Sequence, residues 1–276
     1  MHESNDADDS RPARVIALIQ RLGKFASRAT DGVGYGLALL VRSSAQSPAL
    51  VRRQYRDALL RQMFICGITT IPVVMVVSIF TGMILALNGG LTLEKLGQEA
   101  LIGQIVTISM TREMGPFMTA LILAASVGSG MAAELGTMKV SEEIDALEIM
   151  VIEPARFLVL PRLLAMAIMT PMLTVYTSLV GIAGAAVVSS SQYGVSYLRF
   201  MTEAFNSLTA KDMYTGLLKA IVFGVVIAVV GCTQGLRTTG GAIGVGLATR
   251  RAVVNSYLLI IILGYYITYL FFRVEW

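Results

Sequence analysis

The chain has 276 residues, of which 55% are hydrophobic and 14% are charged, and its mean hydropathy is +0.70. Soluble domains carry about 25% charged residues, so this composition excludes an ordinary soluble protein and indicates an integral membrane protein. The formal net charge of +4 comes largely from an Arg-rich N-terminal segment, which favours contact with a membrane surface over nucleic-acid binding.

The sequence offers few residues for catalysis or metal binding. Its two cysteines, Cys66 and Cys232, do not form a CxxC pair, and its one histidine is His2. A GxxxxGK[ST] motif is also absent, so this chain has no P-loop with which to hold ATP phosphates. We therefore expect no catalytic residues, no metal site and no cofactor bound by this chain.

The N-terminal part divides into two segments. Residues 1–12 are predicted to be a disordered acidic tail, and their lack of an apolar stretch argues against a secretory signal. Residues 13–63 are Arg-rich and interleaved with apolar residues at helical spacing, which is typical of amphipathic helices in a membrane interface. A soluble helical bundle is the alternative interpretation of this segment.

Residues 64–276 are predicted to form an all-α membrane domain with five transmembrane helices. A bilayer requires about 20 consecutive apolar residues per span. The expected spans are residues 64–87, 114–135, 163–188, 217–236 and 253–272.

The distribution of Lys and Arg predicts the orientation of these spans. With a cytoplasmic N-terminus, the cytoplasmic segments hold sixteen Lys and Arg residues and the remainder of the chain holds six. This bias follows the positive-inside rule and places the C-terminus on the periplasmic side.

An acidic stretch, AAELGTMKVSEEIDALEIM (residues 132–150), then falls on the cytoplasmic side. It predicts a short helix at about residues 141–150, with Ser141 as N-cap and Pro154 ending the helix. The predicted polar positions are Glu142, Glu143, Asp145 and Glu148, and the predicted apolar face is Ile144, Leu147, Met150 and Val151.

Such a short helix needs a surface on which to pack, because two to three turns are unstable alone in water. One interpretation is a docking element that inserts into a cleft of a cytoplasmic partner. The other is a solvated connector whose charges keep it out of the bilayer.

Two ionisable residues, Arg112 and Glu113, lie where the second span is predicted to begin on the outer side. Charges near hydrocarbon are costly and indicate a function, although a pair that only anchors the helix end is the alternative. Two runs of small residues, 125–136 and 181–186, permit close helix packing, either within the chain or between copies. Packing within the chain is favoured for the second run.

Several long segments resemble one family in the same order along the chain. They are IPVVMVVSIFTGMILAL, TREMGPFMTALILAA, ELGTMKVSEEIDALEIMVIEPARFLVLPRLLA and KAIVFGVVIAVVGCTQGLRTTGGAIGVGLATRRAVV. Together they resemble the MlaE-type (YrbE-type) permeases, the membrane subunits of lipid-transport ABC transporters associated with MCE proteins.

The resemblance implies a homodimeric permease of the bacterial inner membrane. Residues 141–150 would be the coupling helix that docks on a cytoplasmic ATPase, so ATP would be used by that partner. The cargo would be phospholipid exchanged with a periplasmic MCE protein, which would contribute to outer-membrane lipid asymmetry, and a STAS-domain protein often accompanies the ATPase.

The resemblance also assigns residues. Arg112 and Glu113 would lie near a lipid-binding cavity at the dimer axis, where Arg112 faces a phosphate. Structural roles are expected for Glu134, Gly136, Pro154, Pro161 and Arg162. Glu134 is expected to hydrogen-bond to the connection of the coupling helix.

Some positions depart from the family pattern. Members of the family commonly carry Arg at the position of Ser126, and they often carry an acidic residue near the position of Gly264. Residues 240–246, GGAIGVG, are expected to be a flexible cytoplasmic turn.

Two other functional classes compete with a permease. A non-transporting membrane scaffold would have the same partners and no lipid site. An ion-coupled secondary transporter usually has inverted repeats and mid-membrane acidic residues, and the sequence indicates neither.

Overall fold

The computed structural model describes residues 53–273, and every regular element in that range is helical. The predicted acidic tail (1–12) and most of the predicted interfacial segment (13–63) lie outside the described residues. Within the described range, five helical runs are long and apolar enough to cross a membrane. They are Arg56–Glu94, Glu99–Val140, Ala155–Gln192, Ala210–Leu236 and Gly241–Arg273. The prediction of an all-α membrane protein with five spans is confirmed.

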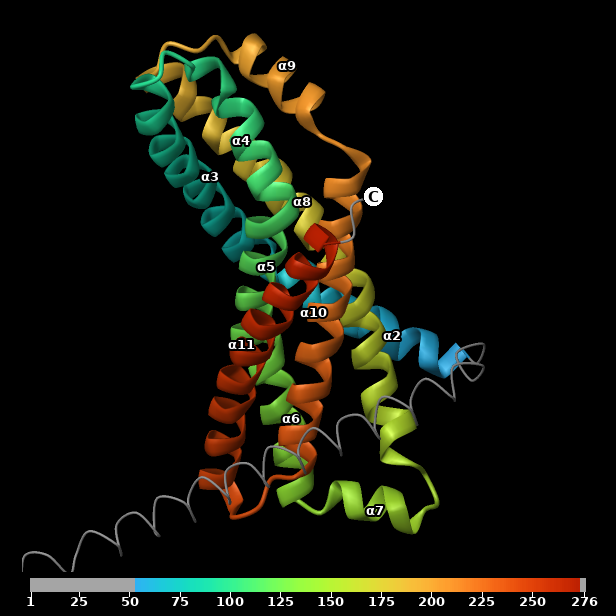
Figure 1. Ribbon diagram of the computed structural model, residues 1–276. Helices are drawn as coiled ribbons and strands as arrows, with labels where there is room; N and C mark the ends of the chain where they lie inside the picture. Colours follow the sequence, from blue (N-terminus) through green and yellow to red (C-terminus); the bar gives the residue numbers. More distant parts are fainter. Residues whose placement is uncertain (1–52, 274–276) are drawn as a thin grey trace, which may run out of the picture.

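The first run consists of α2 (Arg53–Cys66), the 3₁₀ turn η2 (Ile68–Thr70) and α3 (Ile71–Glu94). Helix α2 exposes Leu60 and Phe64, whose side chains are 60% and 54% exposed. In Figure 1, α2 has a shallower tilt than α3. The interfacial role of residues 13–63 remains a prediction.

The second run starts earlier than predicted, at Glu99 instead of residue 114. It consists of η3 (Glu99–Leu101), α4 (Ile102–Ser109), the π-helical turn η4 (Met110–Met114), α5 (Gly115–Leu123), the π-helical turn η5 (Ala124–Gly128) and α6 (Ser129–Val140). Arg112 and Glu113 therefore lie inside a continuous helical run and not at its outer end. Their charges do not end the helix, because neighbouring helices supply ionic partners for them.

The remaining elements begin with α7, which lies within the acidic stretch. They are α7 (Glu143–Ile149), the π-helical turn η6 (Ala155–Val159), α8 (Leu160–Gln192), α9 (Tyr197–Ser207), α10 (Ala210–Leu236) and α11 (Gly241–Arg273). The prediction of a flexible turn over residues 240–246 is wrong, because α11 begins at Gly241. The turn is confined to residues 237–240, and Gly240 has the left-handed φ of 88° that it requires.

Helix α8 lies at the centre of the packing, with α3 on one side and α10 on another. A Cβ atom at Gly82 would lie 1.8 Å from the Gly181 carbonyl oxygen, so glycine lets α3 and α8 approach backbone to backbone. The small-residue run at 181–186 therefore packs within the chain, as predicted. In Figure 1, α3, α4 and α9 lie toward one end of the molecule and α6 and α7 toward the other.

Candidate functional site

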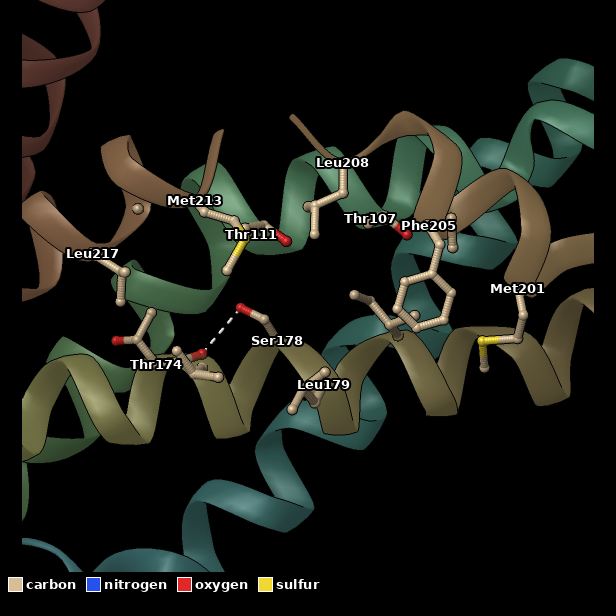
Figure 2. Close-up of a pocket in the computed structure, with 14 residues that line it drawn as sticks. Thr107, Thr111, Thr174, Ser178, Leu179, Met201, Phe205, Leu208, Met213 and Leu217 are labelled. Carbon is tan, nitrogen blue, oxygen red and sulfur yellow. Dashed lines mark hydrogen bonds between the residues drawn. The ribbon is translucent and has the colours of Figure 1, made fainter. Parts of the chain in front are cut away.

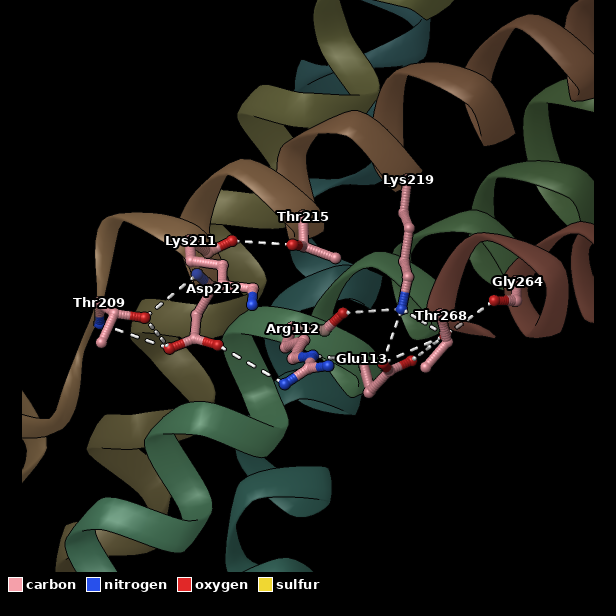
Figure 3. A network of polar contacts seen from close by, with 9 residues as sticks. All are labelled: Arg112, Glu113, Thr209, Lys211, Asp212, Thr215, Lys219, Gly264 and Thr268. Carbon is pink, nitrogen blue, oxygen red and sulfur yellow. Dashed lines mark hydrogen bonds and ion pairs between the residues drawn. The ribbon is translucent and has the colours of Figure 1, made fainter. Parts of the chain in front are cut away.

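A cluster of charged and hydroxyl side chains joins η4, α10 and α11 (Figure 3). We call it the polar cluster, and its members are Arg112, Glu113, Thr209, Asp212, Lys219 and Thr268. It is set among largely apolar helices, where each charge requires a partner.

Lys219 lies at the centre of the polar cluster and is almost fully buried, with 1% of its side chain exposed. Its Nζ lies 2.6 Å from Glu113 Oε1 and donates to Thr268 Oγ1 at 2.8 Å. A third contact, at 3.2 Å, goes to the backbone carbonyl oxygen of Arg112. An ammonium group has three donors, so every donor of Lys219 is engaged.

The local sequence explains why the Arg112 carbonyl oxygen is available. Pro116 follows four residues later and has no amide hydrogen to donate to that oxygen. The π-helical turn η4 also departs from the regular i to i−4 pattern, as π-turns at functional sites often do. Gly216 lets α10 approach η4 closely, since a Cβ atom there would lie 2.1 Å from the Thr111 carbonyl oxygen.

Asp212 forms the second half of the polar cluster at the start of α10. It makes a capping box with Thr209, in which each side chain bonds the backbone amide of the other residue. The Asp212 carboxylate faces Arg112, with 3.9 Å between Oδ1 and Nη1. The charge of Asp212 is thus fixed at a helix N-terminus, where negative charge is favourable.

Arg112 differs from Lys219 because its donors are not saturated. Its nearest carboxylate oxygens, on Asp212 and Glu113, are both 3.9 Å away, which is too long for a hydrogen bond. Its side chain is 28% exposed, whereas that of Lys219 is 1% exposed. The guanidinium is therefore held in place electrostatically and keeps donors for an oxyanion ligand.

The sequence predicted Arg112 and Glu113 but missed Thr209, Asp212, Lys219 and Thr268. Two signals were present: Lys219 is a lone charge inside an apolar run, and Thr209 with Asp212 has capping-box spacing. The sequence indicated no mid-membrane acidic residue, and the structure places the Glu113 carboxylate inside the second run. Lys219 neutralises that carboxylate.

The two departures from the family pattern lie on helices of this part of the fold. The Gly264 carbonyl oxygen accepts a hydrogen bond from Thr268 at 2.8 Å, so Gly264 supports the polar cluster through its backbone. Ser126 is exposed in η5 and donates to the Ile122 carbonyl oxygen at 2.7 Å.

The short acidic helix is present as α7, with ends that differ from those predicted. Ser141 is not its N-cap: it caps the end of α6 and donates to the Thr137 carbonyl oxygen at 2.6 Å. Glu142 precedes α7 in a left-handed conformation with φ of 60°. Pro154 does not end α7 either, because the helix ends at Ile149 and Pro154 instead precedes η6.

The apolar face of α7 is shorter than predicted. Ile144 is buried and Leu147 packs against the same core, so this pair attaches α7 to the body of the protein. Met150 and Val151 are 60% and 92% exposed, and Ile149 beside them is 83% exposed. The helix thus presents an apolar tip, which we define as residues 149–151, together with the exposed carboxylates of Glu142, Glu143 and Glu148.

Charged pairs join α7 to the helices around it. Asp145 forms an ion pair with Lys139 at the end of α6. Glu134 does not bond the connection of α7 but pairs across it with Arg162 on α8, at 2.9 Å. Arg162 is buried and also donates to the Leu158 carbonyl oxygen. These contacts fix the two ends of the loop that carries α7.

The other two residues with expected structural roles lie beside that loop. Gly136 is buried on α6, where a Cβ atom would lie 2.9 Å from Thr238 Oγ1. Pro161 is buried in the first turn of α8, where proline fits because the amide hydrogen is not needed.

The fold and this site define a multi-pass α-helical membrane protein with a partly exposed arginine in its helical body. A family profile described as Permease MlaE matches residues 59–270. The chain belongs to the MlaE permease family.

Relatives in several organisms agree with this assignment. A probable ABC transporter permease protein of Synechocystis is 39% identical over 78% of this chain and 81% of its own length. The intermembrane phospholipid transport system permease protein MlaE of Haemophilus influenzae is 30% identical over 94% of this chain and 98% of its own. The chloroplastic protein TRIGALACTOSYLDIACYLGLYCEROL 1 of Arabidopsis thaliana is 36% identical over 78% of this chain and 61% of its own.

Proposed function

We propose that this chain is the membrane subunit of an ABC transporter that moves phospholipid between the inner membrane and a periplasmic MCE protein. The observation that carries the proposal is the Arg112 guanidinium, which is held in the polar cluster without hydrogen bonds to its carboxylate neighbours. A phosphate headgroup supplies the oxyanion that such a group binds. The name of the Haemophilus relative, a phospholipid transport permease, supports this choice of cargo.

The test is lipid transfer by the reconstituted transporter with Arg112→Ala. We expect transfer to fall at least about tenfold, because a charge-assisted hydrogen bond contributes about 1.5–3 kcal/mol. Arg199→Ala is the matched control, since Arg199 is an exposed arginine on α9 outside the polar cluster. Lost transfer with an intact complex supports a permease, and unchanged transfer favours the non-transporting scaffold.

The coupling to ATP is proposed to run through α7. Its core residues Ile144 and Leu147 hold it against the body, and its carboxylates and apolar tip face outward. This arrangement suits insertion into a groove of an ATPase subunit whose rim is basic. The chain itself would then be non-catalytic, and a STAS-domain protein would join the ATPase.

A homodimer is proposed because α11 leaves an apolar face uncovered. Only 11% of the most apolar part of this run is buried, compared with 50–56% in the second, third and fourth runs. Exposed apolar residues repeat along one side of the helix: Val254, Leu258, Ile261, Ile262 and Tyr265. Since Thr268 of α11 belongs to the polar cluster, a dimer through α11 would place Arg112 near the dimer axis.

The orientation is proposed to be N-terminus cytoplasmic and C-terminus periplasmic in the bacterial inner membrane. The excess of Lys and Arg in the segments predicted to be cytoplasmic supports this orientation. The acidic α7 then faces the compartment that contains ATP.

A further inference from the structure

A second site lies beside the polar cluster, in a pocket between α4, η4, α8, α9 and the start of α10 (Figure 2). Its volume is about 190 Å³. That volume exceeds the roughly 150 Å³ of an engineered apolar cavity that binds benzene, and it is well below the roughly 300–1,000 Å³ of pockets for drug-sized ligands.

The pocket is elongated along α8 and its walls are mostly apolar. The residues of α8 that line it are Thr174, Val175, Ser178, Leu179 and Ile182. Ile182 lies eight positions after Thr174, so at 1.5 Å per residue the wall runs about 12 Å along the helix. This shape suits a linear chain better than a compact ring.

One polar group in the wall lacks a partner. The side chain of Thr107 is 2% exposed, and its hydroxyl has no hydrogen-bond partner among residues 53–273. By contrast, Thr174 and Ser178 in the same wall donate to the carbonyl oxygens of Thr170 and Thr174, at 2.9 and 3.0 Å. A buried unpaired hydroxyl is unfavourable, and an acceptor atom on a ligand would relieve it.

The mouth of the pocket is formed by exposed apolar side chains. Leu179 and Phe205 are 58% and 71% exposed, and Val175 is 40% exposed. An exposed apolar mouth of this kind suits contact with lipid or entry of an apolar ligand. Figure 2 shows Thr107 near Phe205, with Leu217 toward the far end. A polar atom of a ligand would therefore lie beside Thr107, and its apolar tail would extend toward Leu217.

We propose that this pocket binds one fatty acyl chain, with an ester or carboxyl oxygen accepting a hydrogen bond from Thr107. The site belongs to a single protomer, and it does not depend on the transport function proposed above. A free fatty acid and one chain of a phospholipid both supply this chemistry.

The experiment is photo-crosslinking of the full-length protein in phospholipid nanodiscs. One arm uses a long-chain fatty acid with a diazirine on its chain, and the other uses a phosphatidylethanolamine carrying the same chain. Adducts on the α9 peptide that contains Met201 and Phe205 are counted by mass spectrometry. We expect saturable labelling of this peptide in at least one arm, and the arm identifies the source of the chain.

Leu179→Trp fills the mouth and is expected to reduce this labelling about tenfold, because several buried methylenes are displaced. Val187→Trp is the matched control, since Val187 lies on α8, is 55% exposed and does not line the pocket. Thr107→Val should reduce labelling by about threefold to tenfold through loss of one hydrogen bond. If Leu179→Trp does not fold, Val175→Phe provides the same test.

Labelling that does not saturate, or that is equal in Leu179→Trp and Val187→Trp, would overturn the proposal. It would mean that lipid touches α9 only as general solvent of the membrane surface.

Discussion

At the scale of single residues, the polar cluster is built around Lys219. This lysine uses all its N–H donors inside the protein. Arg112 keeps N–H donors available, and its side chain is partly exposed. The two cations therefore have different roles: Lys219 connects the helices, and Arg112 is available to bind a ligand. Sequence reasoning identified Arg112 and Glu113 from their charge near an apolar run, but it did not reveal which helices face them, because that depends on tertiary packing.

Lys219→Met is expected to destabilise the fold by leaving the Glu113 carboxylate without its cation. Breaking a fully buried pair costs about 3–5 kcal/mol, and we expect about 2 kcal/mol here because Glu113 is 38% exposed. Thermal unfolding in detergent measures this loss. Lys219→Met combined with Glu113→Gln should lose less than Lys219→Met alone. Equal or greater loss in the double variant would show that the pair is not coupled.

At the scale of elements, α7 combines a fixed core side with a strained apolar tip. Val151 has a φ of 61°, which is unfavourable for a β-branched residue, and its side chain is 92% exposed. Strain of this kind persists where the surroundings hold it and often marks a functional site.

Val151→Gly therefore separates stability from docking. Glycine adopts this conformation freely, so we expect stability to stay equal or to rise by up to about 1 kcal/mol. Removal of the exposed side chain should weaken binding of the ATPase. Unfolding midpoints and co-purification of the ATPase measure the two effects. Undiminished co-purification would exclude Val151 from the docking surface.

The carboxylates of α7 give a second test at this scale. Glu142→Lys with Glu143→Lys reverses two exposed charges, and neither residue belongs to the Lys139–Asp145 or Glu134–Arg162 pair. We expect the folded protein to remain and the ATPase to be lost on purification. Glu203→Lys on α9 is the control for a charge change elsewhere. Complexes that stay intact in the double variant would favour the solvated connector.

At the scale of the whole molecule, the sequence predicted the class and number of spans because long apolar runs are a strong signal. It misplaced the start of the second span, since Arg112 and Glu113 look like a boundary until Lys219 and Asp212 are brought beside them. It also predicted a turn at residues 240–246, where α11 instead begins at Gly241 despite several glycines. The ends of α7 were missed because Glu142 and Val151 adopt left-handed conformations that no residue type there requires.

The proposed dimer predicts a contact between copies of α11. A single cysteine at Leu258 should form a disulfide between two copies under mild oxidation, and a cysteine at Val187 on α8 should not. Both native cysteines are buried and would compete little. Crosslinking at Val187 in preference to Leu258 would place the dimer interface elsewhere.

The central claim is that this chain is the lipid-binding membrane subunit of an ATP-driven complex. Native mass spectrometry of the tagged protein, gently extracted from its own membranes, tests that claim most directly. We predict two copies of this chain with two ATPase subunits and bound phospholipid, and less bound phospholipid in Arg112→Ala. A complex without an ATPase, or one that retains its phospholipid fully in Arg112→Ala, would contradict it.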